Sequence, residues 1–112
     1  MLTLSIVLFA LAAVLGLTVA VALFKKKETS KPVVLAHGAA GAAGLVLLLL
    51  YALAHTERRL TIAIGLFVVA ALGGFVLLAN DLRRKPGPTF LIVVHAVVAV
   101  MAFVIVLLVA KG

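Results

Sequence analysis

The sequence predicts an all-α integral membrane protein, an up-down-up-down bundle of four helices built from two tandem helical hairpins. The chain has 112 residues, of which 67% are hydrophobic and only three are Asp or Glu. Its mean hydropathy of +1.44 exceeds what a water-soluble domain of this length can cover with polar surface. Four apolar stretches divide the chain, and its two halves align with each other.

Each apolar stretch is long enough to cross a bilayer as a helix. The stretches cover residues 2–24, 32–54, 60–82 and 89–110, and about 20 apolar residues in a helix span a hydrocarbon core of about 30 Å. Helices are expected because the backbone groups of a segment in lipid must be hydrogen-bonded within that segment. The sequence lacks the alternation of apolar and polar residues that would suggest the strands of a barrel. The connections are short, so consecutive helices are expected to be antiparallel. Pro32 and Pro88 lie at helix starts, where proline is tolerated.

An internal repeat relates the two halves. When residues 2–54 are placed over residues 60–112, an offset of 58, 14 of the 53 pairs are identical without a gap. Two spans per copy mean that both copies enter the membrane from the same side, as a parallel repeat. We expect one transmembrane domain, 1–112, and expect residues 2–24 to be retained instead of cleaved as a signal peptide. The most informative coincidences are Thr3 with Thr61, Gly16 with Gly74, Lys27 with Lys85, and His37 with His95.

Loop charge predicts the orientation. Segments 25–31 and 83–88 together carry seven Lys or Arg side chains, whereas the opposite side carries three, Arg58, Arg59 and Lys111. The positive-inside rule puts the first two segments in the cytoplasm and both termini outside. The net charge of +7 lies in short breaks between apolar runs, so the lipid bilayer is the expected partner and nucleic acid is not.

Two histidines occupy equivalent positions of the repeat. His37 and His95 are expected roughly 8–10 Å below the cytoplasmic boundary, on two helices whose axes are diagonal and about 13–14 Å apart. Ionisable groups inside a membrane are costly and usually functional, although a buried histidine bonded to a neighbouring helix is the ordinary alternative. A zinc site needs three or four ligands, and no Cys, Asp or Glu lies near the pair in the apolar stretches. A haem iron needs only two protein ligands, so one haem b between the two histidines is the expected cofactor, with iron as its metal.

Small residues beside the histidines predict a place for the ring. Gly41 and Gly44 continue the helix face of His37 by i+4 and i+7 spacing, and alanines follow His95 at the same spacings. Close packing of membrane helices is the alternative explanation for such residues. The small residues expected at the cofactor site are Gly16, Gly41, Gly44, Gly74, Ala99 and Ala102.

The chain resembles small bacterial four-helix membrane proteins made by hairpin duplication, in which P-x-x-L-x-H-G opens the second helix. The segment PVVLAHG at 32–38 matches this pattern, and the second copy, TFLIVVHA, keeps His95 but has Ala96 in place of the glycine. The resemblance covers the whole chain and implies this fold in the bacterial inner, cytoplasmic membrane. The layout is also similar to four-helix b-type cytochromes, whose bundle histidines ligate haem. It departs from two-haem carriers, which need four histidines, and a designed membrane cytochrome would show the same pattern.

Three functions are compatible with these residues. The first is a b-type cytochrome with one haem, passing electrons between a membrane donor such as a quinol and another acceptor, with a quinol- or oxygen-linked redox activity. The second is a non-redox structural or assembly subunit, and the third is a carrier of haem or a small ligand. Tyr51, His55 and Glu57 form a weaker candidate for a quinone or proton site, with an interfacial aromatic as the alternative. Hydrolase or transferase motifs are missing from the sequence, and the sequence leaves oligomerisation and the redox partner open.

Fusion reporters test the predicted orientation. We expect a reporter fused at the C-terminus to be found in the periplasm. A reporter fused within 83–88 should be found in the cytoplasm, because basic side chains retain that loop inside. Paired alkaline phosphatase and fluorescent-protein fusions measure both sides. The reverse pattern would contradict the charge argument.

Overall fold

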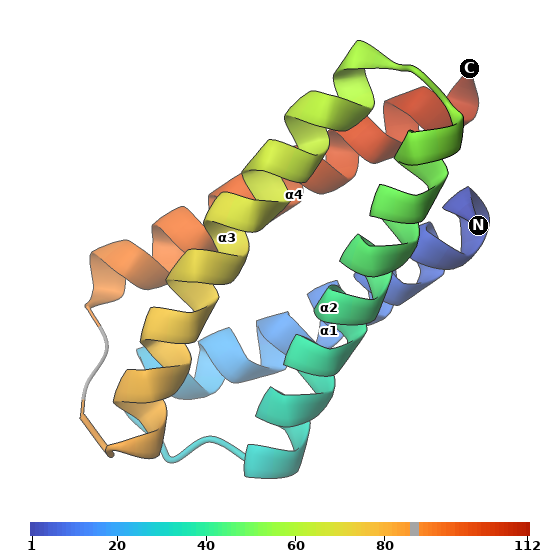
Figure 1. Cartoon of the computed structure of the whole chain (residues 1–112). Coiled ribbons are helices and arrows are strands. Elements are labelled where there is room, and N and C mark those ends of the chain that lie inside the picture. Colours follow the sequence, from blue (N-terminus) through green and yellow to red (C-terminus); the bar gives the residue numbers. More distant parts are fainter. Residues whose placement is uncertain (86–87) are drawn as a thin grey trace.

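The computed structural model describes residues 1–85 and 88–112, and these ranges contain four helices and no strand. The helices are α1 (Leu2–Phe24), α2 (Lys31–Ala54), α3 (Arg58–Leu82) and α4 (Thr89–Lys111) (Figure 1). The α1 bounds agree with the expected ones, and the other three helices differ by one or two residues. The all-α class is therefore confirmed, and all four helices are long and apolar enough to cross a membrane.

Local backbone chemistry explains where the helices end and begin. Lys26 and Arg84, just after α1 and α3, have left-handed backbones with φ of 54° and 56°. In both turns the N–H of the next residue donates to the carbonyl five residues earlier at 2.9 Å, as in a Schellman closure. At the start of α3, the Glu57 side chain accepts a hydrogen bond from the backbone N–H of Arg59, which satisfies an N–H that has no partner inside the helix.

The helices alternate in direction, so both termini and the α2–α3 connection lie at one end of the bundle (Figure 1). We call this the terminal end, and the end with the α1–α2 and α3–α4 connections the basic end. Contacts are most extensive within the hairpins α1–α2 and α3–α4, and less extensive between α2 and α3 and between α1 and α4. The bundle thus consists of two well-packed hairpins in looser contact, with α2 diagonal to α4.

Aromatic rings fill the core towards the terminal end. Phe9 of α1 and Phe67 of α3 stack across the bundle, with centroids 4.0 Å apart and planes at 5°. Phe103 of α4 approaches Phe9 edge-on at 6.4 Å. Offset or edge-on aromatic pairs add to the effect of area burial, so this cluster ties the two hairpins together. Its fully buried aliphatic members include Leu48, Leu60 and Val106.

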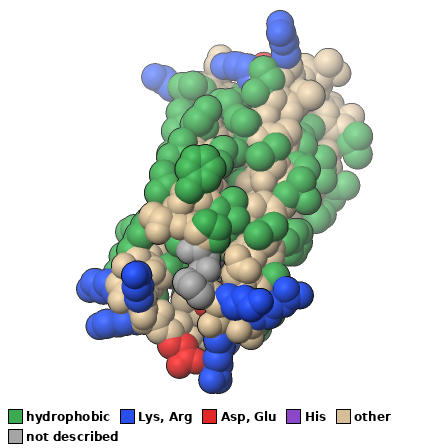
Figure 2. All heavy atoms as spheres, turned by 90° about the vertical axis from the view of Figure 1, so that its left-hand side faces the viewer, with side chains coloured by type: hydrophobic (Ala, Val, Ile, Leu, Met, Phe, Trp, Pro, Cys, Tyr) green, Lys and Arg blue, Asp and Glu red, His purple; other side chains and the backbone are tan. Residues whose placement is uncertain are grey.

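The surface carries an apolar band between two charged ends, as Figure 2 shows for one face. Large apolar side chains of the band are highly exposed, for example Leu53 at 85% and Phe75 at 67%. Contiguous apolar surface on this scale is unfavourable in water and favourable against lipid tails. The surface therefore agrees with helices that cross a bilayer.

A polar cluster joins the two hairpins at the basic end. Lys31 Nζ donates to Asp81 Oδ2 at 2.7 Å, and Thr29 Oγ1 donates to the same oxygen at 2.7 Å. Thr29 is buried, so its hydroxyl and the carboxylate satisfy each other away from water. The sequence did not predict this contact, because its partners are about 50 residues apart along the chain.

The Phe stack is expected to hold the bundle together. Phe67→Ala should lower the free energy of unfolding by about 3–5 kcal/mol, because it leaves a cavity where a buried ring was. Phe75→Ala is the matched control, since its ring lies on the same helix but faces outward, and it should change stability much less. Thermal denaturation in detergent compares the two variants. Equal losses of stability would show that the stack contributes no more to stability than an outward-facing ring.

Candidate functional site

The two predicted histidines face each other across the bundle. His37 lies six residues after Lys31, the first residue of α2, and His95 lies six residues after Thr89, the first residue of α4. Equal spacing in parallel helices gives equal depth, about 9 Å from the helix start. The ring centroids are 6.3 Å apart and the ring planes make an angle of 82°. The fold thus brings together two imidazoles that are 58 residues apart in sequence.

Each imidazole is held by the other helix of its own hairpin. The Nδ1 atom of His37 lies 2.7 Å from the Ala12 carbonyl oxygen, and that of His95 lies 2.7 Å from the Ala70 carbonyl oxygen. A carbonyl only accepts, so a neutral ring must carry its proton on Nδ1 and leave a lone pair on Nε2. Among the described residues nothing hydrogen-bonds to either Nε2, and neither atom is a fully buried polar atom without a partner. Each Nε2 therefore keeps accessible surface.

Two glycines allow the rings to reach these carbonyls. A Cβ added at Gly16 would lie 2.7 Å from His37 Cε1, and one added at Gly74 would lie 3.1 Å from His95 Cε1. Each glycine follows the accepting alanine by four residues, so it lies one helical turn along the same face. Both glycines were expected at the depth of the histidines, and the structure places them against the imidazole rings.

The other predicted small residues have different surroundings. A Cβ at Gly41 would meet no atom within 4 Å, whereas one at Gly44 would lie 3.1 Å from the ring of Phe9. Ala99 is half-buried, and Ala102 is fully buried in the core cluster. Gly44 and Ala102 therefore pack in the core next to the aromatic stack, whereas Gly41 has open space beside it.

Small side chains form a layer between the histidines and the Phe stack. Gly44, where Phe9 packs, follows His37 by seven residues, which is roughly 10 Å along the helix axis. Within this length the buried positions of α1, α2 and α3 are alanines, which have little side-chain volume. The buried alanines of this layer are Ala12, Ala40 and Ala70.

The donor set at the site consists of two imidazoles. In the part of the chain that the structure describes, no group of three or more His, Cys, Asp or Glu side chains is placed to hold a metal ion. Structural and catalytic zinc sites use three or four protein ligands. A metal that already has four ligands from a macrocycle needs only the two that this pair offers.

A second group of polar residues lies at the terminal end. The rings of Tyr51 and His55 stack with centroids 4.0 Å apart, and His55 Nδ1 lies 3.0 Å from the Tyr51 carbonyl oxygen. They line an open cavity of about 390 Å³ together with Glu57 and Arg59. The side-chain hydrogen bond from Arg59 holds the pKa of the Glu57 carboxyl below its ordinary value. His55 follows His37 by 18 residues on the same helix, roughly 27 Å away, so the two cannot share an ion.

Sequence reasoning missed the two carbonyl acceptors. A backbone carbonyl leaves no mark in the sequence, and the alanines themselves are unremarkable in so apolar a chain. The one signal that could have located them is the repeated spacing A-x-x-x-G, present as AAVLG at 12–16 and AALGG at 70–74.

Comparison with protein-family models, characterised proteins and solved structures finds no match to this chain. The residues described above are therefore the basis for a functional proposal.

The contact between Gly16 and His37 can be tested against a matched glycine. Gly16→Ala and Gly41→Ala both replace a helical glycine and gain the same helix propensity. Only the first puts a methyl group 2.7 Å from the imidazole, so the ring must leave the Ala12 carbonyl. We expect Gly16→Ala to be less stable than Gly41→Ala by about 1–2 kcal/mol, the cost of an unmade buried hydrogen bond.

Thermal denaturation in detergent measures this difference. The ¹⁵N chemical shifts of the His37 ring report whether its hydrogen bond is lost. Equal stability of the two variants, with His37 shifts unchanged, would show that the ring does not lie against Gly16.

Proposed function

We propose that the protein is a membrane b-type cytochrome that binds one haem between α2 and α4 through His37 and His95 and transfers electrons. The observation that supports this most strongly is the pair of identical Nδ1-to-carbonyl hydrogen bonds, each 2.7 Å long. A second hydrogen bond from the non-ligating nitrogen is the usual partner of a metal-ligating histidine, because it fixes the tautomer and the ring orientation. Both rings are thus prepared to present Nε2 to an ion.

The separation of the rings also supports a shared ion. A metal–imidazole bond is about 2.0–2.1 Å long and a ring nitrogen lies about 1 Å from the ring centre, so imidazoles on opposite sides of one ion have centres roughly 6 Å apart. The observed centroid separation is 6.3 Å. The separation is therefore close to that of two imidazoles that share one ion.

The small-residue layer is where a planar ring would lie. His37 and His95 would hold the iron, and the layer that contains Ala12 and Ala70, together with the open space at Gly41, would lie against the macrocycle. Entry of the ring requires the two hairpins to separate, and the hairpins contact each other less extensively than the helices within each hairpin. The haem supplies a one-electron iron couple when bound, and the chain supplies two neutral ligands and an apolar surrounding that excludes water.

The basic end supplies partners for acidic groups on such a ring. The histidines lie about 9 Å from the start of α2 and α4, near the exposed cations that follow α1 and α3. Charge-assisted hydrogen bonds to carboxylates are stronger than neutral ones, so a ring with two propionates would be oriented with them towards this end. By the positive-inside rule this end faces the cytoplasm.

A non-redox structural subunit is the second candidate. It is favoured by the fact that each Nδ1 already has a hydrogen-bond partner within its hairpin. In that case the histidines only join α1 to α2 and α3 to α4. The two candidate functions differ in whether the Nε2 atoms of His37 and His95 bind a metal.

Absorption of the purified protein decides between them. We expect a red protein whose reduced form shows the sharp, split bands of six-coordinate low-spin haem. His37→Ala and His95→Ala should each abolish or severely weaken these bands, because each removes one of two axial ligands. His55→Ala is the control and should leave them unchanged, since His55 lies at the other end of α2. Haem retained after both inner histidines are replaced would refute the proposal.

A further inference from the structure

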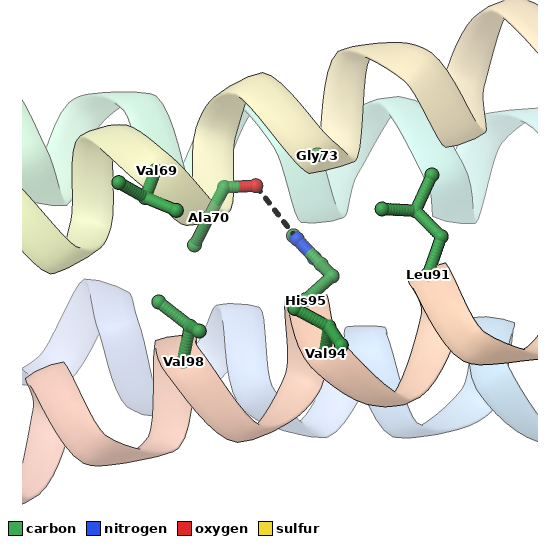
Figure 3. Close-up of a pocket in the computed structure, with 7 residues that line it drawn as sticks. All are labelled: Val69, Ala70, Gly73, Leu91, Val94, His95 and Val98. Atoms are coloured by element: carbon green, nitrogen blue, oxygen red, sulfur yellow. Dashed lines mark hydrogen bonds between the residues drawn. The ribbon is translucent and has the colours of Figure 1, made fainter.

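The two histidines differ in the space beside them. A groove of about 230 Å³ lies between α3 and α4 next to His95, lined almost entirely by apolar side chains. Figure 3 shows it with α3 and α4 in front and the other two helices behind. Val69, on its rim, is 54% exposed, so the groove opens on the outer face of the hairpin, where lipid would lie. It therefore connects the surroundings of His95 with the bilayer.

Gly73 is the residue that leaves the groove open. A Cβ at this position would make only ordinary contacts, 3.7 Å from Leu91 and 3.8 Å from His95. The equivalent position of the first hairpin, 58 residues earlier, is Leu15. His37 is also packed more tightly against its glycine than His95 is, with 2.7 Å against 3.1 Å to the nearest ring atom. The first hairpin thus holds its histidine more closely than the second.

Size and polarity select what the groove can admit. Its volume is below the roughly 300–1,000 Å³ of pockets that enclose drug-sized ligands, so it cannot enclose a macrocycle or a tailed quinone ring. Its apolar lining would not stabilise an ion. A small, neutral, lipid-soluble molecule remains, and such molecules are enriched in the bilayer on which the groove opens.

We propose that the α3–α4 groove is a lateral route from the bilayer to His95, that it admits small neutral ligands such as diatomic gases, and that His95 is the exchangeable member of the pair while His37 stays in place. The exchange rests on the proposed function, and the access route does not. When His95 leaves the shared ion, its ring, which already lies against Ala70 and Gly74 of α3, has the groove to turn into. His37 has Leu15 and the closer Gly16 beside it instead.

The access route is tested on protein without haem. Diethyl pyrocarbonate, a small neutral reagent that acylates imidazole, should modify His95 faster than His37, as measured by mass spectrometry of the intact and digested protein. Gly73→Leu should slow the modification of His95 by roughly tenfold, a barrier change of about 1.4 kcal/mol, and leave the modification rate of His37 unchanged. Gly65→Leu is the matched control, because this exposed α3 glycine has no atom near its Cβ position, and it should have no effect. Equal rates at both histidines, as expected if a lipid chain fills the groove, would overturn the route.

The exchange is tested on haem-loaded protein reduced with dithionite. Carbon monoxide should bind to it, and Gly73→Leu should slow this binding by roughly tenfold without changing the spectrum before the gas is added. Gly73→Ala adds a methyl group at ordinary contact distance, so it gives a milder version of the same change if the leucine variant fails to fold. Leu15→Gly opens the equivalent space beside His37 and leaves the groove beside His95 in place, so it should not slow the binding.

The failures of the two proposals can be told apart. Protein that never binds haem refutes the proposed function, and the modification rates still decide the route. Protein that binds haem but shows the same carbon monoxide rate in Gly73→Leu, Gly73→Ala and the parent chain refutes the assignment of His95 as the exchangeable ligand.

Discussion

The hydrogen bond from each imidazole Nδ1 to a carbonyl of the partner helix is the interaction on which the rest of the structure depends. A polar group without a partner in hydrocarbon is unfavourable by several kcal/mol, and His37 and His95 lie well inside apolar helices. The bond forms only if the ring can lie over a glycine one turn beyond the accepting alanine. It therefore sets the register and the separation of α1 against α2, and of α3 against α4.

The site follows from how these two hairpins meet. They are joined towards the terminal end by the Phe9–Phe67 stack and at the basic end by the Thr29, Lys31 and Asp81 cluster. The histidines and the layer of small residues, with the buried alanines Ala12, Ala40 and Ala70, lie between these two attachments. A ligand that binds between the hairpins must open this middle region, and binding would then stabilise the assembled bundle over its separated hairpins.

The two halves of the predicted repeat have kept the same polar contacts and diverged in volume. Donor, acceptor and glycine are the same residue types at positions 58 apart. Gly44 is matched by Ala102, and Leu15 by Gly73, so space removed in one hairpin is present in the other. The loss of a hydrogen-bond partner is costly for a polar group in lipid, whereas apolar volume can be redistributed among neighbouring side chains. Two nearly symmetric ligands can thereby acquire different freedom to move.

The sequence by itself determined the helices and the equal depth of the histidines. Runs of about 20 apolar residues leave helix as the only spanning structure, and short connections make neighbours antiparallel. The positions of Gly16 and Gly74 beside the histidines were also predictable, because a fixed rise per residue converts sequence position into depth.

The tertiary structure alone decided which groups touch at that depth. The carbonyls of Ala12 and Ala70, the packing of Gly44 on Phe9, and the link from Lys31 to Asp81 depend on how each helix is rotated about its axis. An almost uniformly apolar helix carries little information about that rotation, because lipid and protein interior accept the same side chains. The rotation is set instead by a few polar bonds and by the places where a missing Cβ lets two helices approach.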